Sequence, residues 1–145
     1  MDRKIYAKKP SPCNCINLRR ASQAITEVYD EFLAPSGLKI SQYAMLKNIK
    51  RLEPVSVSDL ALEIRLDRTT LVRNLQPLEA RQLLVDTSPK GARNRQLELT
   101  GRGRETLAAA ELLWLEAQNF VAEYLGEDDM DALTRLLSKI EALTP

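Results

Sequence analysis

Hydrogen-bond donors of different lengths gather in one short segment of the chain. Arginine, threonine and asparagine side chains are the types that reach phosphate oxygens and base edges in DNA. A solvated helix face also carries such residues, so they predict DNA contacts only where the surrounding elements agree with that role. The candidate DNA-contacting residues are Arg68, Thr69, Thr70, Arg73 and Asn74.

A second basic segment, residues 89–95, is rich in turn-forming residues and contains Arg93 and Arg95. It separates apolar residues 83–85 from residues 96–100, which alternate polar and apolar as a half-buried strand does. This pattern predicts a β-hairpin whose loop lies over phosphates or places an arginine in a minor groove, and Arg93 and Arg95, together with Arg73, are expected to contact phosphates.

Two closely joined helices are predicted to position the first cluster. Asp67 is a suitable N-cap, and leucines follow it at helical spacing, which leaves the donors on the outer face near the helix start. Ser56 and Asp59 form a candidate capping box for a preceding helix, so the pair is a helix-turn-helix. We expect Pro77 to kink the second helix beyond its DNA-contacting part.

The charge distribution agrees with this location. Residues 1–64 carry ten basic and seven acidic side chains, residues 65–104 nine and four, and residues 105–145 two and nine. The basic excess therefore falls on the predicted DNA-binding segment. Charge alone is weak support, because any solvated surface carries such runs.

Several classes of protein are disfavoured by the composition. The sequence has no histidine and no Gly-rich phosphate loop, so we expect no enzyme, no cofactor and no metal site. It has no apolar stretch near the roughly 20 residues that span a bilayer, which predicts a cytoplasmic protein without a membrane partner. Two cysteines provide no disulfide framework.

Further helices are predicted over about 17–32, 41–51 and 102–125, with a last helix after Gly126. Their apolar faces exceed what a small lobe can cover, so we expect a homodimer that reads a pseudo-palindromic DNA site. The fold class is mainly α with a small β-wing, as one domain over 1–145. Within it we place a winged helix-turn-helix lobe at about 38–100, dimerisation helices at about 14–34 and 102–144, and an N-terminal arm at 1–12 that is mobile or packs on the partner subunit.

This arrangement resembles the MarR family of bacterial transcriptional regulators over nearly the whole chain. The residues that carry the resemblance are Leu60-Ala61, the run from Leu66 to Leu75, Leu78-Glu79, and Arg93 before Leu97-Glu98-Leu99-Thr100-Gly101.

The resemblance implies that Arg68, Thr69, Thr70 and Arg73 meet DNA and that Arg93 is the wing arginine. The chain departs from the family pattern at three positions. The acid usual two residues before the wing arginine is Gly91 here, and two turn positions that are often glycine are Arg65 and Gln82.

The resemblance also implies regulation by a small aromatic compound, bound between the dimerisation helices and the DNA-binding lobe, or by oxidation of a cysteine. The predicted function is a repressor that an effector releases from DNA. Side chains that could line an effector pocket, or equally form core, are Tyr43, Met45, Trp114 and Phe120.

Two alternatives remain open from the sequence. Cys15 at the start of the first helix and Tyr29 are spaced similarly to the sensing cysteine and hydroxyl partner of the organic-hydroperoxide repressors, and the helix N-terminus would favour the thiolate. Against that alternative, Arg19 replaces another expected tyrosine, and Cys13 is additional. The other alternative is a winged-helix protein–protein adaptor, which would not need arginines at both the helix and the wing.

Overall fold

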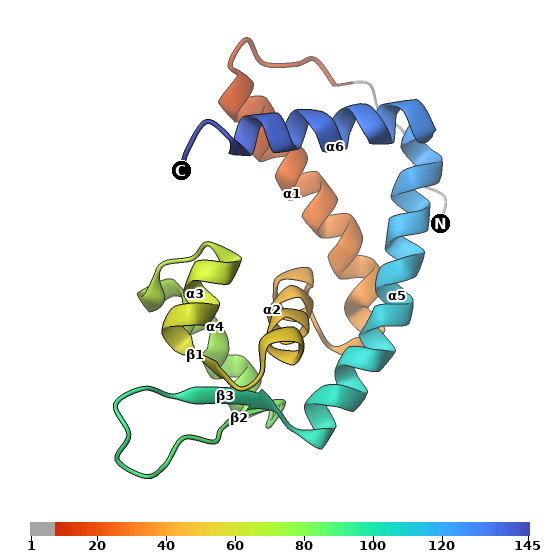
Figure 1. Ribbon diagram of the computed structural model, residues 1–145. Helices are drawn as coiled ribbons and strands as arrows, with labels where there is room; N and C mark the ends of the chain where they lie inside the picture. The colour runs from red at the N-terminus through yellow and green to blue at the C-terminus, as the bar shows by residue number, and fades with distance from the viewer. Residues whose placement is uncertain (1–7) are drawn as a thin grey trace.

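The computed structural model describes residues 8–145, so residues 1–7 of the predicted N-terminal arm lie outside the described part (Figure 1). Most of this part is helical, with a small sheet at one end. The elements in chain order are α1 (Asn14–Leu33), the 3-10 turn η1 (Ala34–Ser36), α2 (Ile40–Leu52), β1 (Val55–Ser56), α3 (Val57–Ile64), α4 (Arg68–Ala80), β2 (Leu84–Asp86), β3 (Gln96–Leu99), α5 (Gly101–Leu125) and α6 (Glu127–Glu141).

The lobe that contains α2, α3, α4 and the sheet is a winged helix-turn-helix, as the sequence predicted. The strand order is β1-β3-β2 and both pairings are antiparallel, with Val55 opposite Leu97 and Leu84 opposite Leu99. One leucine-rich core joins the helices to the sheet. Its fully buried side chains include Leu46, Ile49, Leu60, Leu71, Leu75, Leu78, Leu83 and Leu97.

Short polar side chains start α3 and α4. Ser56 Oγ accepts a hydrogen bond from Asp59 N at 3.0 Å, and Asp67 Oδ1 accepts one from Thr70 N at 2.8 Å. These bonds satisfy backbone donors that have no partner inside the first turn of a helix. Both helix starts are confirmed, and α4 continues past Pro77 to Ala80.

The helix predicted over about 41–51 begins one residue earlier in the structure. Ser41 lies inside the helix, which begins at Ile40 with Lys39 as the N-cap. Asp30 Oδ1 accepts the Ile40 N–H at 2.8 Å, and Gln42 Oε1 accepts the Lys39 N–H at 3.0 Å. The first acceptor comes from α1, so it became available only through tertiary folding.

The turns after α3 and α4 both require left-handed backbone. Arg65 has φ 56° and Gln82 has φ 59°, at the two positions where the MarR-like pattern often has glycine. A side chain in this region costs free energy that glycine would not.

The remaining helices extend away from the lobe. In Figure 1, α5 runs from the end of β3 to the far end of the molecule, α1 packs along it, and α6 crosses beyond them. No helix within residues 8–145 has the length and apolar character that crossing a bilayer requires.

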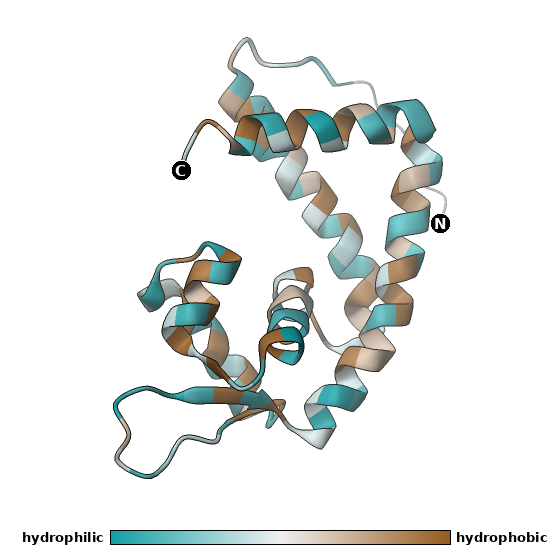
Figure 2. Cartoon of the chain, in the orientation of Figure 1, coloured by the Kyte–Doolittle hydropathy of each residue, from teal (hydrophilic) through white to brown (hydrophobic). Residues whose placement is uncertain are grey.

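The apolar face of α6 is left largely exposed by the other residues of the described range 8–145. None of the helix's own residues is buried, and brown apolar bands recur along it in Figure 2. Large apolar side chains on α1 and α6 remain substantially exposed: Ile16, Leu18, Ile25, Leu133, Leu136, Leu137 and Ile140.

Candidate nucleic-acid interface and effector pocket

The first turns of α4 present the predicted donors on the surface. Arg68, Thr69 and Arg73 are exposed, while Thr70 and Asn74 are partly buried. Arg68 Nη1 donates to Ser58 Oγ of α3 at 3.1 Å, which ties the arginine to the neighbouring helix. The structure therefore places these five predicted residues on one helix, three of them on its exposed side.

The cap of α4 uses one of these donors. The Thr70 hydroxyl donates to Asp67 Oδ2 at 2.6 Å, in addition to the backbone bond from Thr70 N. These two hydrogen bonds, the side-chain bond first, lower the pKa of Asp67 below its usual range. The Thr70 oxygen keeps an acceptor site, but its proton is already directed at Asp67.

The wing loop is organised around Asp86 at the end of β2. Asp86 Oδ1 accepts from Ser88 Oγ at 2.6 Å, Ser88 N at 2.9 Å and Gln96 N at 3.1 Å. The hydrogen bonds from Ser88, the hydroxyl first, lower the pKa of Asp86. Arg93 lies exposed in the loop beyond this base.

Arg95 differs from Arg93 in its surroundings. Its guanidinium forms an ion pair with Glu79 Oε1 of α4, and its Nε lies 3.4 Å from Asp86 Oδ2. Only about a third of the Arg95 side chain is exposed, at 34%. The structure thus brings Arg95 to two carboxylates, whereas Arg93 projects from the wing.

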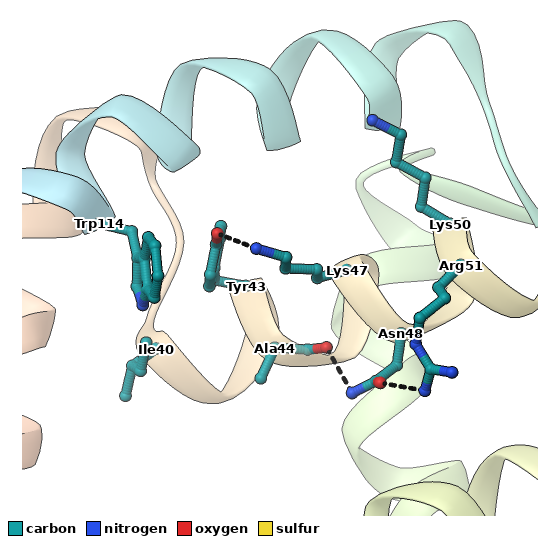
Figure 3. A pocket seen from close by; sticks show the side chains of 8 residues that line it. All are labelled: Ile40, Tyr43, Ala44, Lys47, Asn48, Lys50, Arg51 and Trp114. Atoms are coloured by element: carbon teal, nitrogen blue, oxygen red, sulfur yellow. Dashed lines mark hydrogen bonds between the residues drawn. The ribbon is translucent and has the colours of Figure 1, made fainter. Parts of the chain in front are cut away.

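A pocket of about 500 Å³ lies between α2 and α5 (Figure 3). The rings of Tyr43 and Trp114 stack there, with centroids 5.9 Å apart and planes inclined by 20°. Lys47 Nζ lies 4.8 Å from the Trp114 ring centroid and donates to the Tyr43 hydroxyl at 3.3 Å. Lys50 and Arg51 also border the pocket, which therefore combines an aromatic wall with three cations.

Lys47 remains charged in this setting. The hydrogen bond with Tyr43 is the main cause that raises the pKa of Lys47, and the Glu111 carboxylate, 3.6 Å from Nζ, adds to it. Tyr43 and Trp114 were predicted from the sequence to line a pocket, whereas the three cations were not. Residues 47, 50 and 51 follow Tyr43 at helical spacing, and this spacing is the sequence signal that could have placed them on the same face of α2.

The other two predicted pocket residues lie elsewhere. Met45 is buried and lines a separate cavity of about 590 Å³ between α2 and α4, which Arg73 and Asn74 also line. Phe120 packs on Phe32 of α1, with ring centroids 5.5 Å apart. The four predicted pocket residues are therefore divided among three places.

The redox candidates do not meet within the chain. Cys13 is the N-cap of α1 and Cys15 lies in its first turn, and both are exposed. Tyr29 lies fourteen residues along the same helix, about 21 Å from Cys15 at 1.5 Å per residue. The Tyr29 hydroxyl donates to Gln118 Oε1 of α5, and partial burial raises its pKa.

The junction between the lobe and α5 is closely packed. Glu53 Oε2 accepts the Leu99 N–H at 2.9 Å, and the other oxygen pairs with Arg104 of α5. Thr100 N donates to Leu83 O at 3.1 Å, and its hydroxyl donates to Gln82 O at 2.6 Å. These contacts fix the start of α5 to the base of the wing.

Comparison with known proteins agrees with this architecture. Residues 36–93 match the family model described as MarR family. The transcriptional regulator MosR of M. tuberculosis, solved in complex with DNA, is 32% identical, with a TM-score of 0.76 and coverage of 92% of this chain and 99% of MosR. The transcriptional repressor CouR, solved on a 23-mer DNA duplex, is 31% identical, with a TM-score of 0.81 and coverage of 89% and 92%.

A curated relative matches over a shorter span. The HTH-type transcriptional regulator SarZ of Staphylococcus epidermidis is 29% identical over 92 residues, which cover 63% of this chain and 62% of SarZ. The alignment therefore includes less than two thirds of SarZ. Together with the structural match over nearly the full length of MosR, these similarities show that the chain belongs to the MarR family of transcriptional regulators.

Proposed function

We propose that this protein is a sequence-specific DNA-binding repressor that acts in the cytoplasm, not an enzyme. The observation that carries this proposal is the exposed donor face of α4 beside a wing that projects Arg93. Arg68, Thr69 and Thr70 would contact base edges, and Arg73 and Arg93 would contact phosphates. MosR and CouR, which share the architecture, are known in complex with DNA.

The repressor would act as a homodimer built on a single domain over residues 1–145. The lobe, about 38–100, would bind DNA, and the helices at about 14–34 and 102–144 would form the dimer. The uncovered apolar faces of α1 and α6 support this assembly, because a second copy of the chain would remove them from water. Two recognition helices about one turn of DNA apart, roughly 34 Å, would read a pseudo-palindromic operator.

The effector would be a small aromatic compound bound in the pocket between α2 and α5. Tyr43 and Trp114 offer aromatic surface, and Lys47 and Lys50 favour an acidic group on the ligand, while Arg51 is ion-paired with Glu63. The repressor CouR is known bound to p-coumaroyl-CoA. A ligand that separates α2 from α5 would alter the placement of the lobe and weaken operator binding by a coupling free energy of about 1–3 kcal/mol.

Thiol oxidation is a second candidate for release from DNA. It is favoured by the exposure of Cys13 and Cys15 at the start of α1, a helix of the proposed dimer interface. This route needs no ligand in the pocket, so the two mechanisms can be separated by variants.

DNA binding to the region upstream of the protein's own gene tests the function. Specific binding should appear at low salt, and Arg93→Ala should weaken it across sequences while lowering the salt slope by about one. Thr70→Ala should alter the preference at particular base pairs. Binding of all DNA at only the non-specific level would reject the repressor and favour the protein–protein adaptor.

The same assay separates the two modes of release. Release by an aromatic acid that is lost in Trp114→Ala supports the pocket. Release by an oxidant that is lost in Cys15→Ser supports the thiol.

A further inference from the structure

Three charged side chains from three elements meet where the wing joins the recognition helix. Glu79 belongs to the last turn of α4, Asp86 ends β2, and Arg95 precedes β3. Glu79 Oε1 is buried and accepts no hydrogen bond from the described residues, but it forms an ion pair with Arg95 Nη2, and the Glu79 side chain is 28% exposed. Arg95 Nε approaches Asp86 Oδ2 at 3.4 Å.

An arginine suits this position because its donors point along different edges of a rigid plane. Its Nη2 group forms an ion pair with the Glu79 carboxylate of α4, and its Nε lies near the Asp86 carboxylate of β2. A lysine has one compact charge and could not hold both carboxylates in the same fixed geometry. The two contacts therefore join the helix and the hairpin through one guanidinium group.

The two carboxylates in this cluster offset the positive charge of Arg95, so Arg95 attracts DNA phosphates only weakly. Its single positive charge lies between two negative ones, so the three side chains together carry a net negative charge. Arg93, two residues earlier, is exposed and forms no ion pair with any residue in 8–145. Arg93 is thus the wing side chain that is free to reach a phosphate.

The wing loop is held in position by contacts at its base, where it joins β2 and β3. Gly91 at the tip has φ 85°, and a Cβ there would meet nothing within 4 Å, so the tip is not packed against the lobe. The base is held instead by Asp86, which accepts hydrogen bonds from Ser88 and Gln96 on the two sides of the loop. Arg95 links this base to α4 through Glu79.

We propose that Arg95 is a positioning residue that fixes the wing to the recognition helix through Glu79 and Asp86, so that Arg93 reaches DNA, and that Arg95 itself makes no phosphate contact. This inference rests on the proposed DNA-binding function.

The direction in which one substitution changes the affinity for DNA tests this inference. Glu79→Gln removes a negative charge beside the DNA and frees Arg95, so simple electrostatics predicts tighter binding. Loss of wing placement predicts the opposite, a 5- to 30-fold weaker specific affinity, equivalent to about 1–2 kcal/mol. Glu98→Gln is the matched control, because Glu98 is an acid on the same hairpin without an ion pair in residues 8–145. It should leave affinity unchanged or slightly tighter, and tighter binding by Glu79→Gln would overturn the inference.

A double-mutant cycle distinguishes positioning from direct contact. If Arg95 acts through Arg93, Arg93→Ala should cost little further affinity, and no further salt slope, once Arg95→Gln is present. If both arginines contact phosphates, their losses add and the double variant loses about two units of slope. Additive losses would overturn the inference.

Hydrogen exchange without DNA separates failure of this inference from failure of the proposed function. Glu79→Gln and Arg95→Gln should speed exchange of the amides in residues 87–96, while Glu98→Gln should not, and amides of α5 should be unaffected in all three. Unchanged exchange at the wing overturns the inference even if the protein binds an operator. Faster exchange in a protein that binds no operator supports the structural link and rejects the repressor.

Discussion

Gly103→Ala should destabilise the protein although alanine is the better helix former. Gly103 lies in the first turn of α5 and is buried against the start of the wing. An alanine Cβ at this position would lie 1.9 Å from the backbone oxygen of Leu83. A carbon and an oxygen need about 3 Å, so the helix and the chain at Leu83 must separate by about 1 Å.

The size of the effect follows from the bonds at this junction. Separation would strain Thr100 N to Leu83 O, at 3.1 Å, and the Thr100 hydroxyl to Gln82 O, at 2.6 Å. Each such bond contributes about 0.5–1.5 kcal/mol net, and overpacking costs about 1–3 kcal/mol. The helix propensity of alanine returns up to about 1 kcal/mol. We expect the free energy of unfolding to fall by about 2–3 kcal/mol, which lowers Tm by roughly 4–12 °C.

Urea unfolding at one fixed protein concentration measures this change, since a dimer's stability depends on concentration. Gly101→Ala is the matched control in the same helical turn, because its Cβ would meet nothing within 4 Å. It should leave stability unchanged or raise it by up to about 1 kcal/mol. Equal stability of Gly103→Ala and Gly101→Ala would refute the packing argument.

Three further predictions concern the cap, the dimer and the pocket. The pKa of Asp67 is lower in the folded than in the unfolded protein, so the stabilisation by Asp67 is present above the unfolded pKa of about 4 and is lost as pH falls through the folded pKa. Asp67→Asn should therefore flatten the acid limb of the stability–pH curve measured by urea titration. A variant curve parallel to that of the wild type would contradict this. Leu136→Glu and Ile140→Glu should each shift sedimentation toward the monomer, because a charge would enter the proposed interface, whereas unchanged dimers would place that interface elsewhere. Lys47→Gln should weaken operator release by an aromatic acid but not by the matching neutral amide, measured by anisotropy, and equal loss for both would deny Lys47 its charge-recognition role.

The winged helix-turn-helix was predictable because its signals are local. Asp67 before a leucine repeat and the alternation at 96–100 each encode one element within a few residues. The start of α2 was not predictable in the same way, since the N–H of its first residue, Ile40, donates to Asp30 of another helix. Local patterns specify an element, whereas its exact boundary depends on what packs beside it.

The candidate site shows the same limit. Arg93 and Arg95 look alike in sequence, two residues apart in a basic loop, and only the fold brings Glu79 and Asp86 to one of them. The helical spacing of the aromatic residues could not show that Trp114 and Phe120 have different surroundings. In the structure Trp114 stacks on Tyr43, whereas Phe120 packs on Phe32. Such distinctions come from contacts distant in sequence, which composition and periodicity do not contain.

The order of strands in the small sheet has a consequence for how the lobe folds. The pairing of β2 with β3 joins residues as close as Asp86 and Leu97, whereas β1 pairs Val55 with that same Leu97 across the whole of α3 and α4. We expect the hairpin to form early as a local event and the third strand to add after α3 and α4 have packed, because its pairing spans a longer stretch of sequence. Residues 55–99 should therefore open and close as one cooperative unit.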